Sequence, residues 1–153
     1  MASPRTDTPT LEVVELIGTV VARYYAEYEQ AAAKHSLTGM QARVLGLLTL
    51  EPMPMRRVAQ KLRCEPSNIT GIVDRLESRG LVERRADPND RRVKLAAPTK
   101  DGVDTARRLR ESLDFAREPL AKLSDTERTM LRDLLKRMLG EETPYAVREQ
   151  QNE

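Results

Sequence analysis

Two stretches in which apolar and polar residues alternate, 81–85 and 92–96, flank the sequence Asp-Pro-Asn-Asp at 87–90. Alternation with a period of two is typical of β-strands, and Asp, Pro and Asn favour tight turns. The segment is therefore predicted to form a two-stranded hairpin. Its tip is flanked by two arginine pairs, at 84–85 and 91–92. Either these cations reach toward a polyanion, or the hairpin ends in a solvated turn with surface ion pairs worth ~0–1 kcal/mol each.

Two short amphipathic helices are predicted just before the hairpin. Residues 55–62 form the first, and the second begins at Pro66, whose missing N–H is harmless in the first turn of a helix. A tight turn at 63–65 separates the two helices, and Gly80 ends the second one after about Ser78. Helix, tight turn, helix and hairpin, in this order, predict a winged helix-turn-helix unit.

Further helices are predicted upstream of this unit. Apolar residues at helical spacing predict a long helix over 11–34, and its apolar stripe is wider than one neighbour needs, which indicates packing on two sides. Thr38 and Gln41 form a capping box that opens the next helix. That helix is predicted to end before Pro52.

Two more helices are predicted downstream. Thr99 is placed to cap a fifth helix whose apolar stripe continues to Ala116, and Pro119 is expected to kink or end it. A second capping box at 124–127 opens a sixth helix, which Gly140 ends. Apolar residues of the sixth helix recur in pairs four residues apart, a spacing that suits helix packing or a partner subunit.

The predicted fold is mainly α with a small β-wing. A chain of 153 residues has the size of one ordinary domain, so a single domain is expected over residues 10–140. The winged helix-turn-helix core is expected at about 38–98, with flanking helical regions at about 10–34 and 99–140. The polar ends, 1–9 and 141–153, are expected to be flexible.

Charge is distributed unevenly along the chain. Residues 55–95 contain eleven Lys or Arg against six Asp or Glu, a local charge of +5 in a chain of net charge +2, so the remainder carries −3. One basic segment on a mildly acidic chain is typical of a polyanion-binding site. Aromatic residues make up only 3% of the chain, which argues against a stacking surface for single-stranded nucleic acid.

The sequence also carries signals about the cellular compartment. A single cysteine excludes an internal disulfide and fits a reducing cytosol. No apolar run is long enough to span a bilayer, and the first residues lack the apolar segment of a signal peptide. A soluble, cytoplasmic protein without a membrane partner is therefore expected.

The second short helix is the predicted recognition helix, because in a winged helix-turn-helix it enters the major groove of duplex DNA. Small polar side chains on its outer face can approach base edges, and Arg75 can reach a guanine or a phosphate. The residues expected to read the groove are Ser67, Asn68, Thr70, Gly71 and Arg75. Phosphate contacts are expected from Arg56, Arg57, Lys61, Arg63, Arg84 and Lys94, and these should supply most of the affinity.

The wing is predicted to overhang the neighbouring minor groove, where a narrow groove concentrates negative potential. Arg92 is the expected inserted side chain, and Arg91 beside it is also expected to contact DNA. Asp90, two residues before Arg92, is expected to hold the Arg92 guanidinium in a bidentate pair. The solvated turn is the competing interpretation.

Residues 67–92, SNITGIVDRLESRGLVERRADPNDRR, resemble the MarR family (multiple antibiotic resistance regulators), and the resemblance extends over nearly the whole chain. Its specific part is DRLESRGLVERRADPNDRR together with the later PTKDG. The family's Asp-x-Arg wing motif falls on Asp90 and Arg92, and the arginine closing its Gly-Leu-Val-x-Arg motif falls on Arg84. Many members have Leu-Thr where this chain has Pro-Thr at 98–99, which we expect to alter packing rather than binding.

The resemblance implies an assembly. Helices one, five and six would form the dimerisation region of a homodimer, and each winged helix would read half of a near-palindromic operator. It also suggests a ligand cleft between the dimerisation region and the winged helix. The residues expected to line this cleft are Tyr24, Tyr28, His35 and Arg43.

Two interpretations of the cleft residues stay open. The tyrosines crowd one stretch of the first helix and are explained equally by core packing. Arg43 would suit a small anionic aromatic ligand, or it would form an ion pair at the dimer interface. His35 is otherwise interpreted as an ordinary surface residue, and Cys64 as structural rather than as a redox switch.

The predicted function is that of a dimeric regulator that binds a specific duplex DNA sequence, as a repressor that a small-molecule ligand releases. The alternative is a winged helix that contacts proteins without specific DNA binding, although its recognition face lacks large apolar anchors. An enzyme is not expected, since there is no Gly-rich phosphate loop and no nucleophile–base pair around His35. One Cys and one His cannot build a structural zinc site, so neither a metal nor a cofactor is expected.

Overall fold

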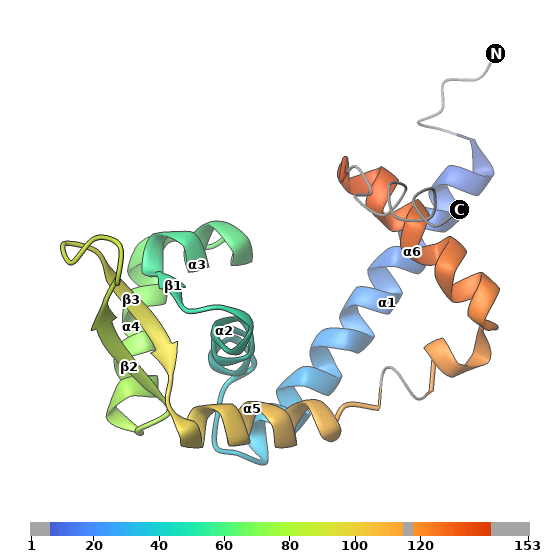
Figure 1. Ribbon diagram of the computed structural model, residues 1–153. Coiled ribbons are helices and arrows are strands. Elements are labelled where there is room, and N and C mark those ends of the chain that lie inside the picture. The colour runs from blue at the N-terminus through green and yellow to red at the C-terminus, as the bar shows by residue number, and fades with distance from the viewer. Residues whose placement is uncertain (1–6, 115–117, 142–153) are drawn as a thin grey trace, which may run out of the picture. The chain divides into compact units, whose positions relative to one another are not determined.

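The computed structural model describes residues 7–114 and 118–141. The chain divides into two compact units, Met1–Leu113 and Asp114–Glu153, and each is described by itself. The first unit is mostly helical with a small antiparallel three-stranded sheet (Figure 1), which confirms the predicted fold class. The expectations for Ala116 and for most of the two polar ends lie outside the described residues.

Helix α1, Thr8–Ala33, begins three residues earlier than its apolar pattern predicts. Pro9 lies in its first turn, where the missing N–H takes no bond from the helix, so the expectation of a flexible segment up to residue 9 is wrong for Thr8 and Pro9. Only Tyr28, Ala31 and Ala32 of α1 are buried. The helix is therefore anchored to the first unit by its last two turns.

Helix α2, Gly39–Leu50, opens with the predicted capping box. The Thr38 hydroxyl accepts the N–H of Gln41 over 3.1 Å, and the Gln41 side chain accepts the N–H of Thr38 over 3.0 Å. The Glu29 carboxylate of α1 accepts the N–H of Gly39 over 3.0 Å. A Cβ at Gly39 would overlap this carboxylate, so the glycine allows α1 to cap the start of α2.

Helices α3, Met55–Leu62, and α4, Pro66–Ser78, have the bounds that the sequence predicts. Arg63 makes the tight turn between them in the left-handed conformation, with φ 51°. The N–H of Cys64 donates to the carbonyl of Ala59 over 3.0 Å and closes α3. The residues that the two helices bury are Val58, Ala59, Ile69, Val73 and Leu76.

The sheet contains the predicted hairpin and one strand that the sequence did not reveal. Strands β2, Val82–Ala86, and β3, Lys94–Pro98, pair antiparallel, and the two-residue strand β1, Met53–Pro54, pairs with the other edge of β3. The strand order is β1-β3-β2. Strand β3 starts two residues later than predicted, because residues 91 and 92 belong to the turn.

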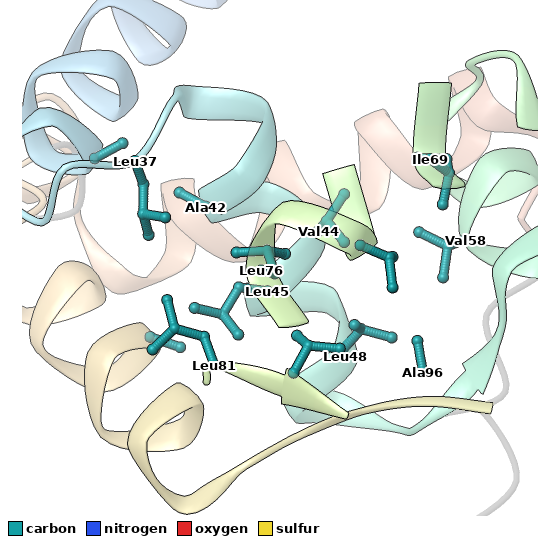
Figure 2. Packing of buried hydrophobic residues seen from close by; sticks show 14 of the residues in the cluster. Leu37, Ala42, Val44, Leu45, Leu48, Val58, Ile69, Leu76, Leu81 and Ala96 are labelled. Atoms are coloured by element: carbon teal, nitrogen blue, oxygen red, sulfur yellow. The ribbon is translucent and has the colours of Figure 1, made fainter. Parts of the chain in front are cut away.

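The core of the first unit gathers around α2. Figure 2 shows Leu45 and Leu48 of α2 between residues of α4 and the sheet, among them Leu76 and Ala96. Leu45, Leu48 and Leu76 have no exposed surface. Removing one such side chain typically lowers the free energy of unfolding by about 2–5 kcal/mol, so this cluster holds α4 and the wing in a fixed relation.

Helix α5, Lys100–Glu111, starts directly after β3. The Thr99 hydroxyl accepts the N–H of Gly102 over 3.1 Å, as predicted, and donates to the carbonyl of Gly80 over 2.6 Å. A Cβ at Gly102 would overlap the carbonyl oxygen of Leu81. This close approach joins the start of α5 to the base of the wing.

The end of α5 was predicted wrongly, because the helix stops at Glu111 and does not reach Pro119. The Ser112 hydroxyl donates to the carbonyl of Leu109 over 2.7 Å, and the Ser112 N–H donates to the carbonyls of Arg108 and Leu109. A serine that bonds back to the preceding turn competes with continuation of the helix.

In the second unit, the short 3₁₀ helix η1, Leu120–Lys122, precedes α6, Asp125–Leu139. The predicted capping box is present, with Ser124 and Glu127 bonded reciprocally, and Gly140 ends the helix at φ 71°. None of the residues of α6 is buried. Its exposed apolar side chains are Met130, Leu131, Leu134, Leu135, Met138 and Leu139.

Candidate nucleic-acid interface

The outward face of α4 is polar and exposed. The helix buries its apolar side chains against α2 and α3, and this packing turns the opposite face toward solvent. The exposed residues of that face include Ser67, Asn68, Thr70, Gly71 and Arg75. The structure thus brings together on one surface all five residues that were expected to read a DNA groove.

Two of these residues have properties that suit a close ligand. A Cβ at Gly71 would meet nothing within 4 Å, so packing inside the chain does not require a glycine there. The Thr70 hydroxyl donates to the carbonyl of Pro66 over 3.2 Å. Its hydrogen is therefore used inside the helix, and its oxygen is left as an acceptor toward the solvent side.

Two open grooves lie beside the start of α4. One has a volume of about 750 Å³ and runs between α3 and α4, with Arg56 and Arg63 on its walls. The other has a volume of about 430 Å³ and extends along α4 to Arg75. Asn68 and Cys64 line both grooves. Three arginines thus surround the polar face of α4, an arrangement that fits a polyanion.

The other expected phosphate-binding cations differ in their surroundings. Lys61, in the last turn of α3, and Lys94, at the start of β3, are exposed. Arg57 is also exposed, and its guanidinium lies 3.4 Å from the carboxylate of Glu51. An exposed ion pair of this kind contributes ~0–1 kcal/mol, so a phosphate can replace Glu51 at little cost.

The tip of the wing is organised by two aspartates that bond to the backbone. The Asp87 carboxylate accepts the N–H of Asn89 over 2.8 Å, and the Asp90 carboxylate accepts the N–H of Arg92 over 3.0 Å. Such bonds are the Asx turns that Asp favours. The side chains of Arg91 and Arg92 are exposed.

The expected bidentate pair between Asp90 and Arg92 is a point on which the structure differs from the sequence analysis. No ion pair joins Asp90 to the Arg92 guanidinium in residues 7–114. The Asp90 carboxylate is turned toward the main chain, because both residues lie in the turn rather than on one face of a strand. Asp90 therefore shapes the backbone that presents Arg92 and leaves the guanidinium unrestrained.

The surroundings of Arg84 also differ from what the sequence predicted. Its guanidinium lies 2.5 Å from a carboxylate oxygen of Asp74 and 3.2 Å from one of Glu77, and it also contacts the sulfur of Met55 at 3.8 Å. The hydrogen bond to Asp74 is the main reason that the pKa of Arg84 is raised above its usual value. Arg84 thus ties β2 to α4 through two exposed carboxylates, and its expected phosphate contact stays a prediction.

The expected ligand cleft is only partly assembled. The rings of Tyr24 and Tyr28 lie 5.5 Å apart, and burial raises the pKa of both phenols. Arg43 lies 5.1 Å from the centre of the Tyr25 ring, in the cation–π range. A cavity of about 90 Å³ is lined by Tyr25, Tyr28 and Arg43 among others. Tyr24 and His35, which were expected to line the cleft, do not line this cavity, and Tyr25, which was not expected there, does.

A second cavity is also lined by Tyr28. Its volume is about 170 Å³, and its walls come from α1, α2 and α5, with Leu50 and Arg110 among the lining residues. The guanidinium of Arg110 donates to the Thr49 hydroxyl over 3.2 Å. Arg110 was missed in the sequence, because its distance from Tyr28 along the chain gave no signal that the two meet.

No group of three or more His, Cys, Asp or Glu side chains in residues 7–114 and 118–141 is arranged to hold a metal ion. No helix in the same part of the chain has both the length and the apolar character needed to cross a bilayer.

A helix-turn-helix whose second helix presents a polar face beside an arginine-bearing wing defines a winged helix-turn-helix protein. The sequence model of the MarR family matches residues 38–94. The chain is also 32% identical over 107 residues to the HTH-type transcriptional regulator MhqR of Bacillus subtilis (strain 168), a match that covers 69% of this chain and 74% of MhqR. The chain therefore belongs to the MarR family of transcriptional regulators.

Two further similarities support this assignment. The uncharacterized HTH-type transcriptional regulator YdgJ of Bacillus subtilis (strain 168) is 32% identical over 108 residues, and the match covers 66% of this chain and 65% of YdgJ, slightly less than two thirds of that protein. Among solved structures, CouR from Rhodococcus jostii RHA1, bound to p-coumaroyl-CoA, matches with a TM-score of 0.71 and 29% identity. That match covers 90% of this chain and 95% of CouR.

Proposed function

We propose that this chain forms a homodimer that binds a specific, near-palindromic sequence in double-stranded DNA and regulates transcription there. The observation that carries the proposal is the exposed polar face of α4, flanked by Arg56, Arg63 and Arg75 and followed by a wing with exposed Arg91 and Arg92. In a winged helix-turn-helix protein, the second helix of the helix-turn-helix is the element that enters the major groove.

The recognition helix supplies sequence selectivity. Ser67, Asn68 and Thr70 form hydrogen bonds with base edges in the major groove, and Arg75 reaches a guanine or a phosphate. Arg92 enters the adjacent minor groove, where its charge is drawn to a narrow, negative groove. The flanking cations bind phosphates and supply an affinity that depends strongly on salt.

The second copy of the chain covers apolar surface that a monomer exposes. Helix α1 exposes Val14, Ile17 and Val20, and α6 exposes a stripe centred on Leu134 and Leu135. Exposed apolar surface of this extent on two helices is typical of a protein interface. A two-fold dimer presents two recognition helices, so its operator has two half-sites.

A small anionic aromatic ligand regulates DNA binding. The two cavities lined by Tyr28, with Arg43 at one and Arg110 at the other, offer apolar walls and a cation. A cavity of roughly 150 Å³ is large enough for one benzene ring. CouR, which is similar to this chain, binds p-coumaroyl-CoA in its solved structure. A ligand that prefers a different spacing of the two recognition helices lowers the affinity for DNA.

The regulatory direction that we propose is repression, because a dimer bound at a promoter occludes it and ligand binding releases it. The protein acts in the cytoplasm, where it meets the DNA. We propose neither a catalytic role nor a cofactor for it.

The competing function is a winged helix that binds proteins. Selection of bound duplexes from a random library, followed by measurement of affinity at two salt concentrations, separates the two. We expect an enriched near-palindromic sequence whose affinity falls steeply as salt rises. A folded, dimeric protein that enriches no sequence at low salt would contradict the proposal and favour the protein-binding alternative.

A further inference from the structure

Arg79, the residue that follows the recognition helix, forms a contact that neither the DNA-binding surface nor the core accounts for. Its guanidinium donates one hydrogen bond to the carbonyl of Ser36 over 2.6 Å and another to the carbonyl of His35 over 2.9 Å. These carbonyls lie 43 and 44 residues earlier in the chain, in the turn between α1 and α2. The contact joins the end of α4 to the end of α1.

The turn that receives Arg79 has an uncommon backbone. Ser36 adopts a left-handed conformation with φ 56°, although it is not a glycine. The N–H groups of His35 and Leu37 both donate to the carbonyl of Ala32, which closes α1. The carbonyls of His35 and Ser36 point away from these bonds and are the acceptors that Arg79 uses. A cation at the C-terminal end of a helix is also favoured by the helix dipole.

Helix α4 is therefore held near its C-terminal end by two arginines that lie outside it. Arg84 holds the carboxylates of Asp74 and Glu77 from the side of the sheet. Arg79 fixes the end of the helix to the α1–α2 turn. The opposite end of α4 carries the exposed Ser67 and Asn68.

We propose that Arg79 is a positioning residue for DNA recognition, and that it couples the orientation of the recognition helix to that of α1. The buried residues of α1 are Tyr28, Ala31 and Ala32, and the Glu29 carboxylate accepts the N–H of Gly39. The Arg79 bonds add a direct connection between the end of α1 and the recognition helix. This inference rests on the proposed DNA binding. In the proposed complex Arg79 does not contact DNA. It acts by fixing the spacing of the two recognition helices in the dimer.

The test compares Arg79→Met, which keeps the length of the side chain and removes its charge and donors, with Arg79→Lys, which keeps the charge and one direct donor. Arg108→Met is the matched control, since Arg108 is exposed on α5 and its side chain forms no hydrogen bond or ion pair recorded in the described residues. Each variant is measured against the selected operator and against a scrambled duplex, at several salt concentrations. Circular dichroism and thermal melting establish that each is folded at the temperature of the binding experiment.

We expect Arg79→Met to weaken operator binding roughly tenfold more than Arg108→Met does, with scrambled DNA affected equally by both variants. The slope of log affinity against log salt should match that of the control, since no phosphate contact is lost. Arg79→Lys should recover part of the operator preference.

Three results would overturn the inference. Equal operator binding by Arg79→Met and Arg108→Met would show that the contact does not position α4. A salt slope lower than that of the control by about 0.9 would make Arg79 a phosphate ligand instead. If Arg79→Met is unfolded, the test depends on Arg79→Lys. An Arg79→Lys variant with the stability and the operator preference of the wild type would also overturn the inference. Failure of the wild-type protein to prefer the operator would instead refute the proposed function.

Discussion

The guanidinium of Arg84 donates to a carboxylate oxygen of Asp74 over 2.5 Å, and this bond links strand β2 to the recognition helix α4. Arg84 is only 25% exposed and Asp74 is 58% exposed. The Arg84–Asp74 pair is thus neither buried nor fully solvated. It adds little to the free energy of unfolding, and its main effect is to fix the position of β2 relative to α4.

A double-mutant cycle measures this link. Arg84→Met and Asp74→Asn should each lower the free energy of unfolding, and their coupling should be about 0.5–1 kcal/mol, the upper range for a largely exposed pair. Urea denaturation of the four proteins gives the coupling. A value near zero would mean that the bond has no role in holding the wing against α4.

Removal of the wing-tip cation should weaken DNA binding. Arg92→Ala should lower operator affinity and reduce the slope of log affinity against log salt by about 0.9, the value for one released counterion. Stability should be unchanged because the side chain is exposed. Fluorescence anisotropy over a salt series is the measurement, with Arg108→Ala as control. A slope equal to that of the control would exclude the wing tip from the contact surface.

Changes on the outward face of α4 should alter selectivity and spare the fold. Ser67→Ala and Asn68→Ala should each relax the preference at one or two base pairs, with a loss of discrimination of about 1–3 kcal/mol. Both side chains are exposed, so melting temperatures should stay within a degree or two of the wild type. Repeated duplex selection with each variant is the readout, and an unchanged consensus would argue against groove contacts by these residues.

The apolar stripe of α6 should be needed for dimer formation. Leu135→Glu places a charge within the exposed stripe and should shift the protein toward monomer in sedimentation experiments. Thr129→Glu, on the opposite face of the same helix, is the matched control and should remain dimeric. If both variants sediment as dimers, this stripe is not the interface.

The capping box of α6 predicts a pH dependence. Hydrogen bonds from the backbone and side chain of Ser124 lower the pKa of Glu127 below its usual 4.5. A carboxylate with a depressed pKa in the folded state stabilises the protein above its unfolded pKa, and the effect is lost as the pH falls through the folded value. The difference in melting temperature between wild type and Glu127→Gln should therefore be present at pH 7 and vanish as the pH falls through the lowered pKa of Glu127. A difference that is independent of pH would show that the cap does not depend on the charge.

Local signals were sufficient for the elements that position the site. Both capping boxes contain their own partners within four residues, and Pro66 marks the start of α4 by a property of its ring alone. The helical period then assigned one face of α4 to the core, and its remainder to solvent. For this reason the residues expected to read DNA are exposed on α4 in the structure.

Features that depend on distant partners were not predictable. Strand β1 has two residues and contains Pro54, so it exists only because β3 offers it an edge. The partners of Arg79 lie 43 and 44 residues away, and nothing in the local sequence indicates them. Arg84 was read as a cation available to phosphate because its acidic partners belong to the neighbouring helix, and only their meeting in three dimensions reveals the pair.

Helix α1 packs against its unit from Tyr24 onward, and its earlier turns expose apolar side chains, so a small tilt at the packed end displaces the other end by a larger distance. Its 26 residues correspond to a length of about 39 Å at 1.5 Å per residue. A tilt of about 5° at the anchored root would then sweep the far tip through about 3 Å, by the geometry of a rigid rod of that length. A ligand no larger than one aromatic ring, bound beside Tyr28 at the packed end of α1, would therefore move the far end of the helix.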